Sequence, residues 1–203
     1  EVEQILDELG EKIELKKNEI LFHDGNNPKG VFKILEGKVK IYACGDDGKE
    51  HIIHIASKDE IIGFRAILSG VSYKVSAKTL EYCQIQFIKK LDFMEIMNSN
   101  TTFRNSIIVK LSRELGDRAL LVTTMSQKTV KSRLALSLIQ LNEIYNGTIT
   151  LSREDLANFI GTATENLIRT LKMFKTENLI HVDGKKIELL DTQKLNEIGK
   201  DLL

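Results

Sequence analysis

The sequence predicts an α+β protein in which a β-barrel, a long helix and a helical domain with a β-hairpin follow one another. Three observations lead to this prediction. Short β-rich runs broken by turn residues fill residues 12–88, an almost glycine-free and proline-free stretch covers 99–125, and helical periodicity with clear caps follows from residue 127. We therefore expect a β-barrel domain at 1–98, a connecting helix at 99–126 and a second domain at 127–203.

Length and composition are typical of a soluble protein with two domains. The 203 residues exceed the usual single-domain size of about 100–150 residues. No run approaches the roughly 20 apolar residues of a membrane span, and no basic segment followed by an apolar one begins at Glu1, so we expect a cytoplasmic protein. The formal net charge is zero. This value leaves nucleic-acid binding open, because a basic surface can be local.

The first region has the short, evenly spaced strands of a β-sandwich or barrel. Residues 45–48 (Gly-Asp-Asp-Gly) predict a hairpin turn, because these residues tolerate positive φ. Val39, Ile41 and Ala43 alternate with polar side chains, so one face of that strand is expected to be buried. The expected strands are 20–22, 31–35, 39–42, 52–55, 75–77 and 83–88.

A short helix at 91–98 and a long one at 99–125 are expected next. In the long helix, side chains at alternating steps of three and four residues form the a/d seam of a coiled coil and predict a dimer interface. They are Ile108, Leu111, Leu115, Arg118, Val122 and Met125. Phe103, Ile107 and Leu121 form a second stripe that can face the barrel. The alternative is a single amphipathic helix that lies on its own domain.

The C-terminal region reads as helix, strand, helix, turn, helix and β-hairpin. The expected elements are helices at 129–145, 152–160 and 163–177, a strand at 148–151, and strands at 179–182 and 186–190 around Asp183-Gly184. Ser152 is expected to cap the second of these helices, and Gly161 to end it. A second capping pattern at 162–165 opens the third. This order is the layout of a winged helix-turn-helix, whose second helix enters the major groove of DNA.

The third of these helices carries the predicted DNA contacts. Leu167, Leu171 and Phe174 form its inward stripe. An outward arginine can donate two hydrogen bonds to guanine, and a carboxylate can accept one from cytosine. The alternative role of Glu165 and Arg169 is an ordinary i to i+4 ion pair, which can coexist with base reading. The candidate DNA-binding residues are Thr162, Thr164, Glu165, Ile168, Arg169 and Lys172.

Residues 150–190 resemble the C-terminal domain of the CRP/FNR family of bacterial regulators. The similarity lies in the glycine before the second helix, a glutamate followed four residues later by an arginine, Leu-Lys-Met, and Asn-Leu-Ile before the hairpin. Upstream, residues 36–39, 48–50, 59–63 and 77–79 resemble that family's double-stranded β-helix, a jelly-roll barrel. The resemblance implies base reading by Glu165 and Arg169, a dimerisation helix, an inverted-repeat operator in double-stranded DNA and contact with RNA polymerase.

The same resemblance argues against cyclic AMP as the effector. In cyclic-nucleotide members a glycine precedes an acid that holds the ribose, and an Arg-Ser pair holds the phosphate. Here Phe64 replaces the acid, and Val71 and Ser72 occupy the Arg-Ser positions. A buried phosphate without a cationic partner is unfavourable. The candidate effector-pocket residues, which line an apolar pocket or fill it, are Phe64, Arg65, Ile67, Leu68, Ser72 and Tyr73.

The effector itself is not identified by the sequence. An iron-sulfur cluster needs about four cysteine ligands, and these residues include only Cys44 and Cys83. Haem stays open, since four histidines are candidate ligands: His23, His51, His54 and His181. No catalytic or metal-binding constellation is recognised, so we expect no enzyme. The alternative function is an effector-binding or haem-based sensor module that acts through protein contacts without binding DNA.

Overall fold

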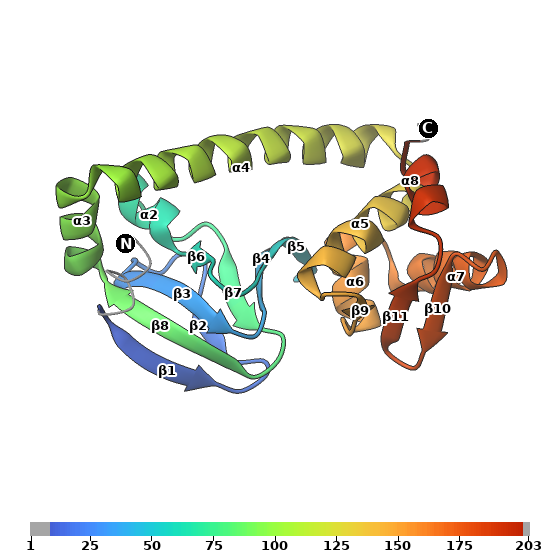
Figure 1. Cartoon of the computed structure of the whole chain (residues 1–203), viewed down its shortest axis with the longest axis horizontal. Helices are drawn as coiled ribbons and strands as arrows, with labels where there is room; N and C mark the ends of the chain where they lie inside the picture. Colours follow the sequence, from blue (N-terminus) through green and yellow to red (C-terminus); the bar gives the residue numbers. More distant parts are fainter. Residues whose placement is uncertain (1–8, 201–203) are drawn as a thin grey trace. The chain divides into compact units, whose positions relative to one another are not determined.

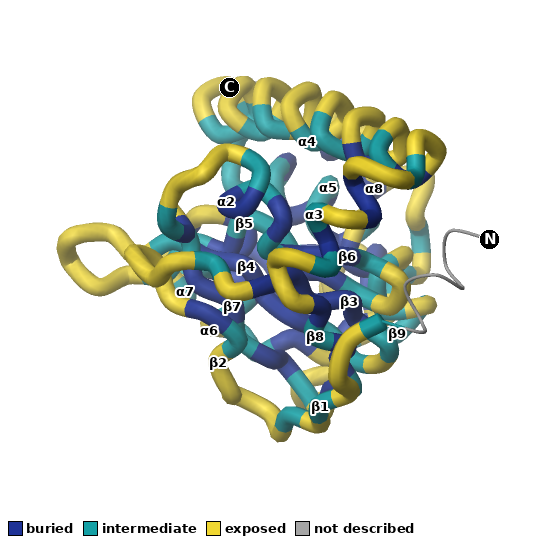
Figure 2. The backbone as a smooth tube through the Cα atoms, turned by 90° about the vertical axis from the view of Figure 1, so that its left-hand side faces the viewer, coloured by how far each residue is buried: buried dark blue, intermediate teal, exposed yellow. Residues whose placement is uncertain are grey.

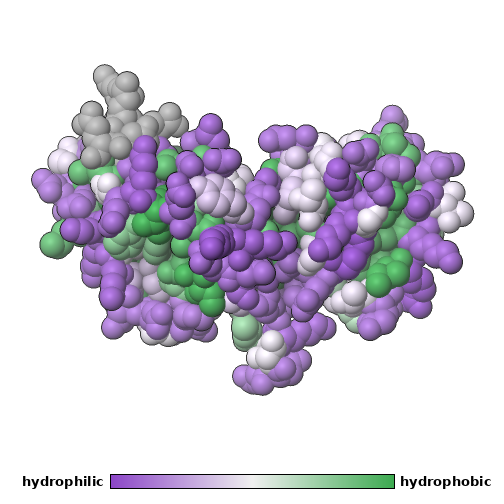
Figure 3. Space-filling model, turned by 90° about the horizontal axis from the view of Figure 1, so that it is seen from below, coloured by the Kyte–Doolittle hydropathy of each residue, from purple (hydrophilic) through white to green (hydrophobic). Residues whose placement is uncertain are grey.

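The computed structural model describes residues 9–200, so the expected domain ends at 1 and 203 lie outside the described part. Contacts divide the chain into two compact units, one ending at Leu115 and the other beginning at Gly116, with residues 49–52 assigned to the second. Helix α4 (Thr101–Gln127) runs through the boundary (Figure 1). Hydrophilic residues predominate on the face shown in Figure 3.

Two four-stranded antiparallel sheets, in the orders β1-β8-β3-β6 and β2-β7-β4-β5, form the N-terminal jelly roll (Figure 1). Its strands are β1 (Glu11–Leu15), β2 (Ile20–Phe22), β3 (Gly30–Glu36), β4 (Val39–Cys44), β5 (Glu50–Ala56), β6 (Ile61–Ile62), β7 (Ser76–Thr79) and β8 (Cys83–Lys89). All six expected strands are present. The sequence reading named neither β1 nor β6, because β6 is only two residues long and β1 carries three charged side chains among its five residues.

Aromatic side chains fill the interior of the barrel. The rings of Phe22 and Tyr73 stack with their centroids 3.9 Å apart, and Phe32 lies 5.8 Å from Phe22. The expectation that β4 buries one face is incomplete. Lys40 and Tyr42 are buried as well as the inward Val39 and Ile41, and the Lys40 ammonium lies 5.1 Å from the centre of the Tyr42 ring. The lysine stem and the ring thus cover apolar surface on the other face.

Helices α2 (Phe64–Ser69), α3 (Lys90–Ser99) and the first half of α4 share a second core. Phe93 of α3 meets Phe103 of α4 edge to face, with ring centroids 5.9 Å apart. Phe103 and Ile107 are both buried in this core, as expected for the stripe that faces the barrel domain. Leu121, the third member of that stripe, is only partly buried and belongs to the second unit, so the stripe ends before it. The long helix begins at Thr101 and not at residue 99 as expected. The Asn100 side chain accepts a hydrogen bond from the Phe103 N–H (2.9 Å), and this contact marks the start of α4 and separates it from α3.

The second unit contains the predicted winged helix-turn-helix. Its elements after α4 are α5 (Val130–Ile144), β9 (Thr148–Ile149), α6 (Arg153–Ile160), α7 (Thr164–Thr176), β10 (Ile180–Asp183), β11 (Lys186–Leu189) and α8 (Thr192–Lys200), and the sheet order is β10-β11-β9. Leu134 and Leu138 of α5 and Phe174 of α7 are completely buried in this unit.

Helix α8 was not predicted, although it is amphipathic and buries Leu195 and Ile198. It packs closely on α5, because a Cβ on Gly199 would lie 2.5 Å from the Leu136 side chain. The Lys128 ammonium donates a hydrogen bond to the Gly199 carbonyl (2.7 Å). No helix in the described part of the chain combines the length and apolar character of a membrane span.

Candidate nucleic-acid interface and sensing domain

The turn between α6 and α7 is fixed by caps and by an arginine from α5. The Ser152 hydroxyl accepts from the Asp155 N–H (3.0 Å), and Gly161 ends α6 at a φ of 68°, as expected. The Arg133 guanidinium donates to the carbonyls of Ile160 (3.0 Å) and Gly161 (3.1 Å). These carbonyls have lost helical partners at the end of α6, so Arg133 satisfies them and holds the turn.

Helix α7 separates an apolar face from a polar one. Leu167, Leu171 and Phe174 are buried, as the sequence predicts. Glu165, Ile168, Arg169 and Lys172 are exposed. Their spacing of three and four residues places them on one side of the helix. The second unit therefore presents a mixed carboxylate, alkyl and cationic surface.

The start of α7 differs from the expected capping pattern. The helix begins at Thr164, and Ala163 occupies the cap position without a side-chain hydrogen bond. Thr162 is only 8% exposed, and its N–H donates to the Ala157 carbonyl at the end of α6 (3.0 Å). Thr164 is partly exposed. Of the six candidate DNA contacts, Thr162 thus offers the least surface.

Arg169 is held by a partner that the sequence reading missed. Its Nη2 donates to Asn166 Oδ1 at 2.9 Å. Among the described residues, the anticipated Glu165–Arg169 ion pair does not form within 4.0 Å, so the Glu165 carboxylate is not engaged by that guanidinium. The signal for the Asn166 contact is its i to i+3 spacing from Arg169, at which side chains on a helix are neighbours.

The β-hairpin after α7 is held by two cationic side chains. Arg153 at the start of α6 donates to the carbonyls of Gly184 (2.8 Å) and Lys185 (3.3 Å) at the hairpin tip. Burial lowers the pKa of Arg153, which stays a cation at neutral pH. Lys175 of α7 donates to the Val182 carbonyl (3.3 Å). These contacts leave Lys185 and Lys186 exposed on the hairpin.

The six candidate pocket residues occupy three environments in the first unit. Phe64 and Ile67 are buried in the core shared with α3 and α4. Tyr73 is buried in the barrel, where its hydroxyl donates to the Gly30 carbonyl (3.3 Å) and burial raises its pKa to about 12. Leu68 and Ser72 are partly exposed. The aromatic residues of the set therefore fill apolar space.

The positions that the resemblance assigns to cyclic-nucleotide contacts carry uncharged side chains. Phe64 stands where an acid would hold the ribose, and it is only 2% exposed within an apolar cluster. Tyr73 is the next residue after the Val71-Ser72 pair in the sequence, and its ring is stacked on Phe22 inside the barrel. Neither position supplies the cation that a buried phosphate requires.

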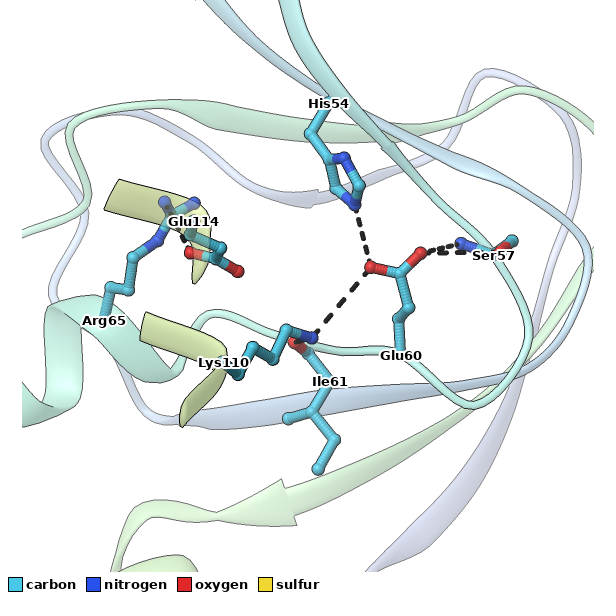
Figure 4. A network of polar contacts seen from close by, with 7 residues as sticks. All are labelled: His54, Ser57, Glu60, Ile61, Arg65, Lys110 and Glu114. Carbon is cyan, nitrogen blue, oxygen red and sulfur yellow. Dashed lines mark hydrogen bonds and ion pairs between the residues drawn. The ribbon is translucent and has the colours of Figure 1, made fainter. Parts of the chain in front are cut away.

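Arg65, the remaining candidate, belongs to a polar network that ties the barrel to α4 (Figure 4). Its Nη1 lies 3.1 Å from Glu114 Oε2. In the same network, Lys110 of α4 donates to the Ile61 carbonyl (3.1 Å) and lies 3.9 Å from Glu60. The segment that resembles an effector site is thus joined to the long helix by side chains of both charges.

Glu60 is the centre of this network. Its Oε2 lies 2.8 Å from His54 Nε2, and its Oε1 accepts from the Ser57 N–H (2.9 Å). Burial acts to raise the pKa of Glu60, but the contact with His54, the Ser57 hydrogen bond and the charge of Lys110 outweigh it, so the pKa lies below its usual value. His54, one of the candidate haem ligands, is engaged in this contact.

Both halves of the chain match known protein families. Residues 12–100 match the cyclic nucleotide-binding domain, and residues 132–198 match the Crp-like helix-turn-helix domain. The transcriptional activator protein anr of Pseudomonas aeruginosa is 30% identical over 195 residues, which cover 89% of this chain and 77% of that protein. Electron transport regulator A of Shewanella oneidensis is 28% identical over 206 residues, with coverage of 97% and 81%.

Solved structures share the fold. FixK2 from Bradyrhizobium japonicum aligns with a TM-score of 0.86 and 18% identity, covering 95% of this chain and 98% of that one. A CooA mutant from Carboxydothermus hydrogenoformans aligns with a TM-score of 0.78 and 21% identity, covering 97% and 90%. The jelly roll, long helix and winged helix-turn-helix are therefore a known combination.

Proposed function

Because this chain belongs to the CRP/FNR family of DNA-binding transcriptional regulators, we propose that it binds an inverted-repeat operator as a homodimer in the cytoplasm. Its relatives are regulators and not enzymes. The observation that carries the proposal is the outer face of α7, where Glu165 and Arg169 are exposed above a buried apolar stripe. Such a helix, supported by α6 and followed by a hairpin, suits the major groove.

Arg169 and Glu165 are the proposed base-reading residues. A guanidinium donates two hydrogen bonds to O6 and N7 of guanine, and a carboxylate accepts one from N4 of cytosine. Asn166 orients the guanidinium through its 2.9 Å hydrogen bond. Each half-site should therefore contain a G·C pair. The proposed contacts also include Thr164 and Lys172, together with Thr162 at the edge of the surface.

The hairpin and α7 supply cations for the DNA backbone. Lys172 of α7 and Lys185 and Lys186 of the hairpin are exposed on a chain whose formal net charge is zero. Phosphate contacts of this kind position a protein on DNA without reading its sequence. Arg153 contributes indirectly, because it fixes the hairpin carbonyls next to Lys185.

The proposed dimer interface follows α4, whose outer side is exposed (Figure 2). Ile108, Leu115 and Val122 are 51%, 73% and 70% exposed and recur every seven residues, which is the spacing of a coiled-coil seam. The other members of the expected seam, Leu111, Arg118 and Met125, are partly buried by their own chain. The seam is therefore centred on the Ile108, Leu115 and Val122 row.

We assign the barrel (1–98) to sensing, 99–126 to dimerisation and 127–203 to DNA binding. A two-fold dimer places two copies of α7 in major grooves about 34 Å apart, which is why the operator should be an inverted repeat. We also propose contact with RNA polymerase, which the resemblance to this family of regulators supports. The Arg65–Glu114 and Lys110–Ile61 contacts offer a physical connection between barrel and dimerisation helix.

The test is to replace Arg169 by alanine and to measure the affinity of the full chain for a specific and a random duplex at one salt concentration. Specific binding should weaken by about 1–3 kcal/mol, while non-specific binding changes little. Arg113→Ala is the matched control, since Arg113 is an exposed arginine on α4, outside the proposed surface. Equal losses on both duplexes would refute base reading by Arg169.

A further inference from the structure

We propose that Lys128 fixes the DNA-binding module (α5 to α8) to the second half of α4 and thereby determines which half-site spacing the dimer accepts. This inference rests on the proposed DNA binding by a homodimer and adds a specificity determinant outside the surface that contacts DNA. Helix α4 ends at Gln127 and α5 begins at Val130, so only two residues separate the proposed dimerisation helix from the module. Lys128 is the first of these two.

The backbone of Lys128 is bonded to both sides of this junction. Its N–H donates to the Thr124 carbonyl (3.1 Å), which extends the hydrogen-bond ladder of α4 by one residue. Its carbonyl accepts from Nη1 of Arg133 on α5 (2.9 Å). The same guanidinium donates to the carbonyls of Ile160 and Gly161 in the turn before α7. The end of α4 is therefore connected through one arginine to the turn that precedes α7.

The side chain of Lys128 makes a third connection. Its ammonium donates to the Gly199 carbonyl near the end of α8 (2.7 Å). The last carbonyls of a helix lack helical partners and carry partial negative charge, so an ammonium is favourable there. Helix α8 is itself fixed to the module, because Leu195 and Ile198 are buried and Gly199 packs closely on Leu136 of α5. The lysine is thus anchored to a part of the module that cannot move freely.

These three bonds restrain the orientation of the module relative to the second half of α4, which belongs to the same compact unit. Two helices joined by two residues can reorient through a few backbone dihedrals at the ends of the elements. Here such a change would strain or break the bonds of Lys128 to Arg133 and to Gly199. Both have a cationic donor, and hydrogen bonds of this kind are stronger than those between neutral groups.

The spacing of the two half-sites depends on this restraint. Val122, a member of the proposed dimer seam, lies on the second half of α4. In a two-fold dimer held by that seam, the orientation of each module on its α4 sets the separation of the two copies of α7. One extra base pair between the half-sites moves one of them by about 3.4 Å and turns it by about 35° around the DNA axis. A restrained junction cannot follow this displacement.

The test uses the operator that the full chain selects from a random pool, and two duplexes whose spacer is one base pair longer or shorter. Dissociation constants are measured by fluorescence anisotropy. The parent chain should bind the altered spacings about 100-fold more weakly, and for Lys128→Met this difference should shrink to about tenfold, since each subunit loses one charge-assisted hydrogen bond. Affinity for a duplex with a single half-site should stay within twofold of the parent value, because the DNA-contacting surface is unchanged.

Lys194→Met is the matched control, because Lys194 is an exposed lysine of the same helix α8. This variant should keep the full spacing penalty of the parent. If Lys128→Met also keeps it, or if the parent binds all three spacings within twofold, the role of Lys128 is refuted while DNA binding stands. An equal loss of affinity for the operator and for the single half-site would also refute it, since the lysine would then only support the fold of the module. If the parent enriches no duplex, both this inference and the proposed function fail.

Discussion

Replacing Leu115 by alanine should weaken the proposed dimer without unfolding the protein. Burying a leucine side chain fully contributes about 1.5–3 kcal/mol. Because 73% of Leu115 is exposed in the single chain, most of this gain is available only on association. We expect a loss of about 1.5 kcal/mol per subunit, and two subunits make about 3 kcal/mol. The dimer dissociation constant should therefore rise more than 100-fold.

Sedimentation velocity over a dilution series measures this constant. The matched control is Leu120→Ala, because Leu120 is 66% exposed on the same helix but lies about 140° around it from Leu115. Leu120→Ala should dimerise like the parent chain, and thermal unfolding of diluted samples should show little change for either variant. A Leu115→Ala dissociation constant within twofold of the parent value, or an equal effect of Leu120→Ala, would refute the proposed seam.

Two further predictions concern polar contacts. Arg153→Ala removes the donors that hold the hairpin, so the affinity for DNA should fall about three- to tenfold on specific and random duplexes alike. Amide hydrogen exchange in β10 and β11 should also become faster. Unchanged amide exchange in these strands would contradict this role of Arg153. Glu60→Gln should destabilise the protein by about 1 kcal/mol at pH 7, where the carboxylate is charged. The folded pKa of Glu60 lies below its ordinary 4.5, so this stabilisation is present above the unfolded pKa and lost as pH falls through the folded pKa. The difference in unfolding midpoint between parent and variant should shrink from pH 7 to pH 3, and an equal difference at both would contradict the account.

Local features of the winged helix-turn-helix could be predicted because their signals lie within a few residues. Ser152 caps α6 through a residue three positions away, and Gly161 ends that helix with a backbone conformation that glycine adopts without strain. The buried stripe of α7 follows from helical periodicity alone. Six of the eight strands of the jelly roll could be predicted in the same way from the turn residues between them, whereas β1 and β6 could not.

Features that depend on distant parts of the chain could not be predicted. Arg153 and Arg133 each bond to carbonyls about thirty residues away, and nothing in the local sequence marks these partners. That the aromatic residues of the pocket segment fill apolar space depends on contacts distant in sequence, such as the stacking of Tyr73 on Phe22, 51 positions away. Periodicity predicts a seam on α4, but it does not show that Leu111 packs against its own chain.

Selection of bound duplexes from a random DNA pool tests the central claim most directly. The purified full chain is used at moderate salt, first without added ligand and then with haem or cyclic nucleotides. The account predicts enrichment of an inverted repeat with a G·C pair in each half-site, and loss of this enrichment for Arg169→Ala. Failure to enrich any sequence under all of these conditions would contradict it and favour a sensor module that acts through protein contacts.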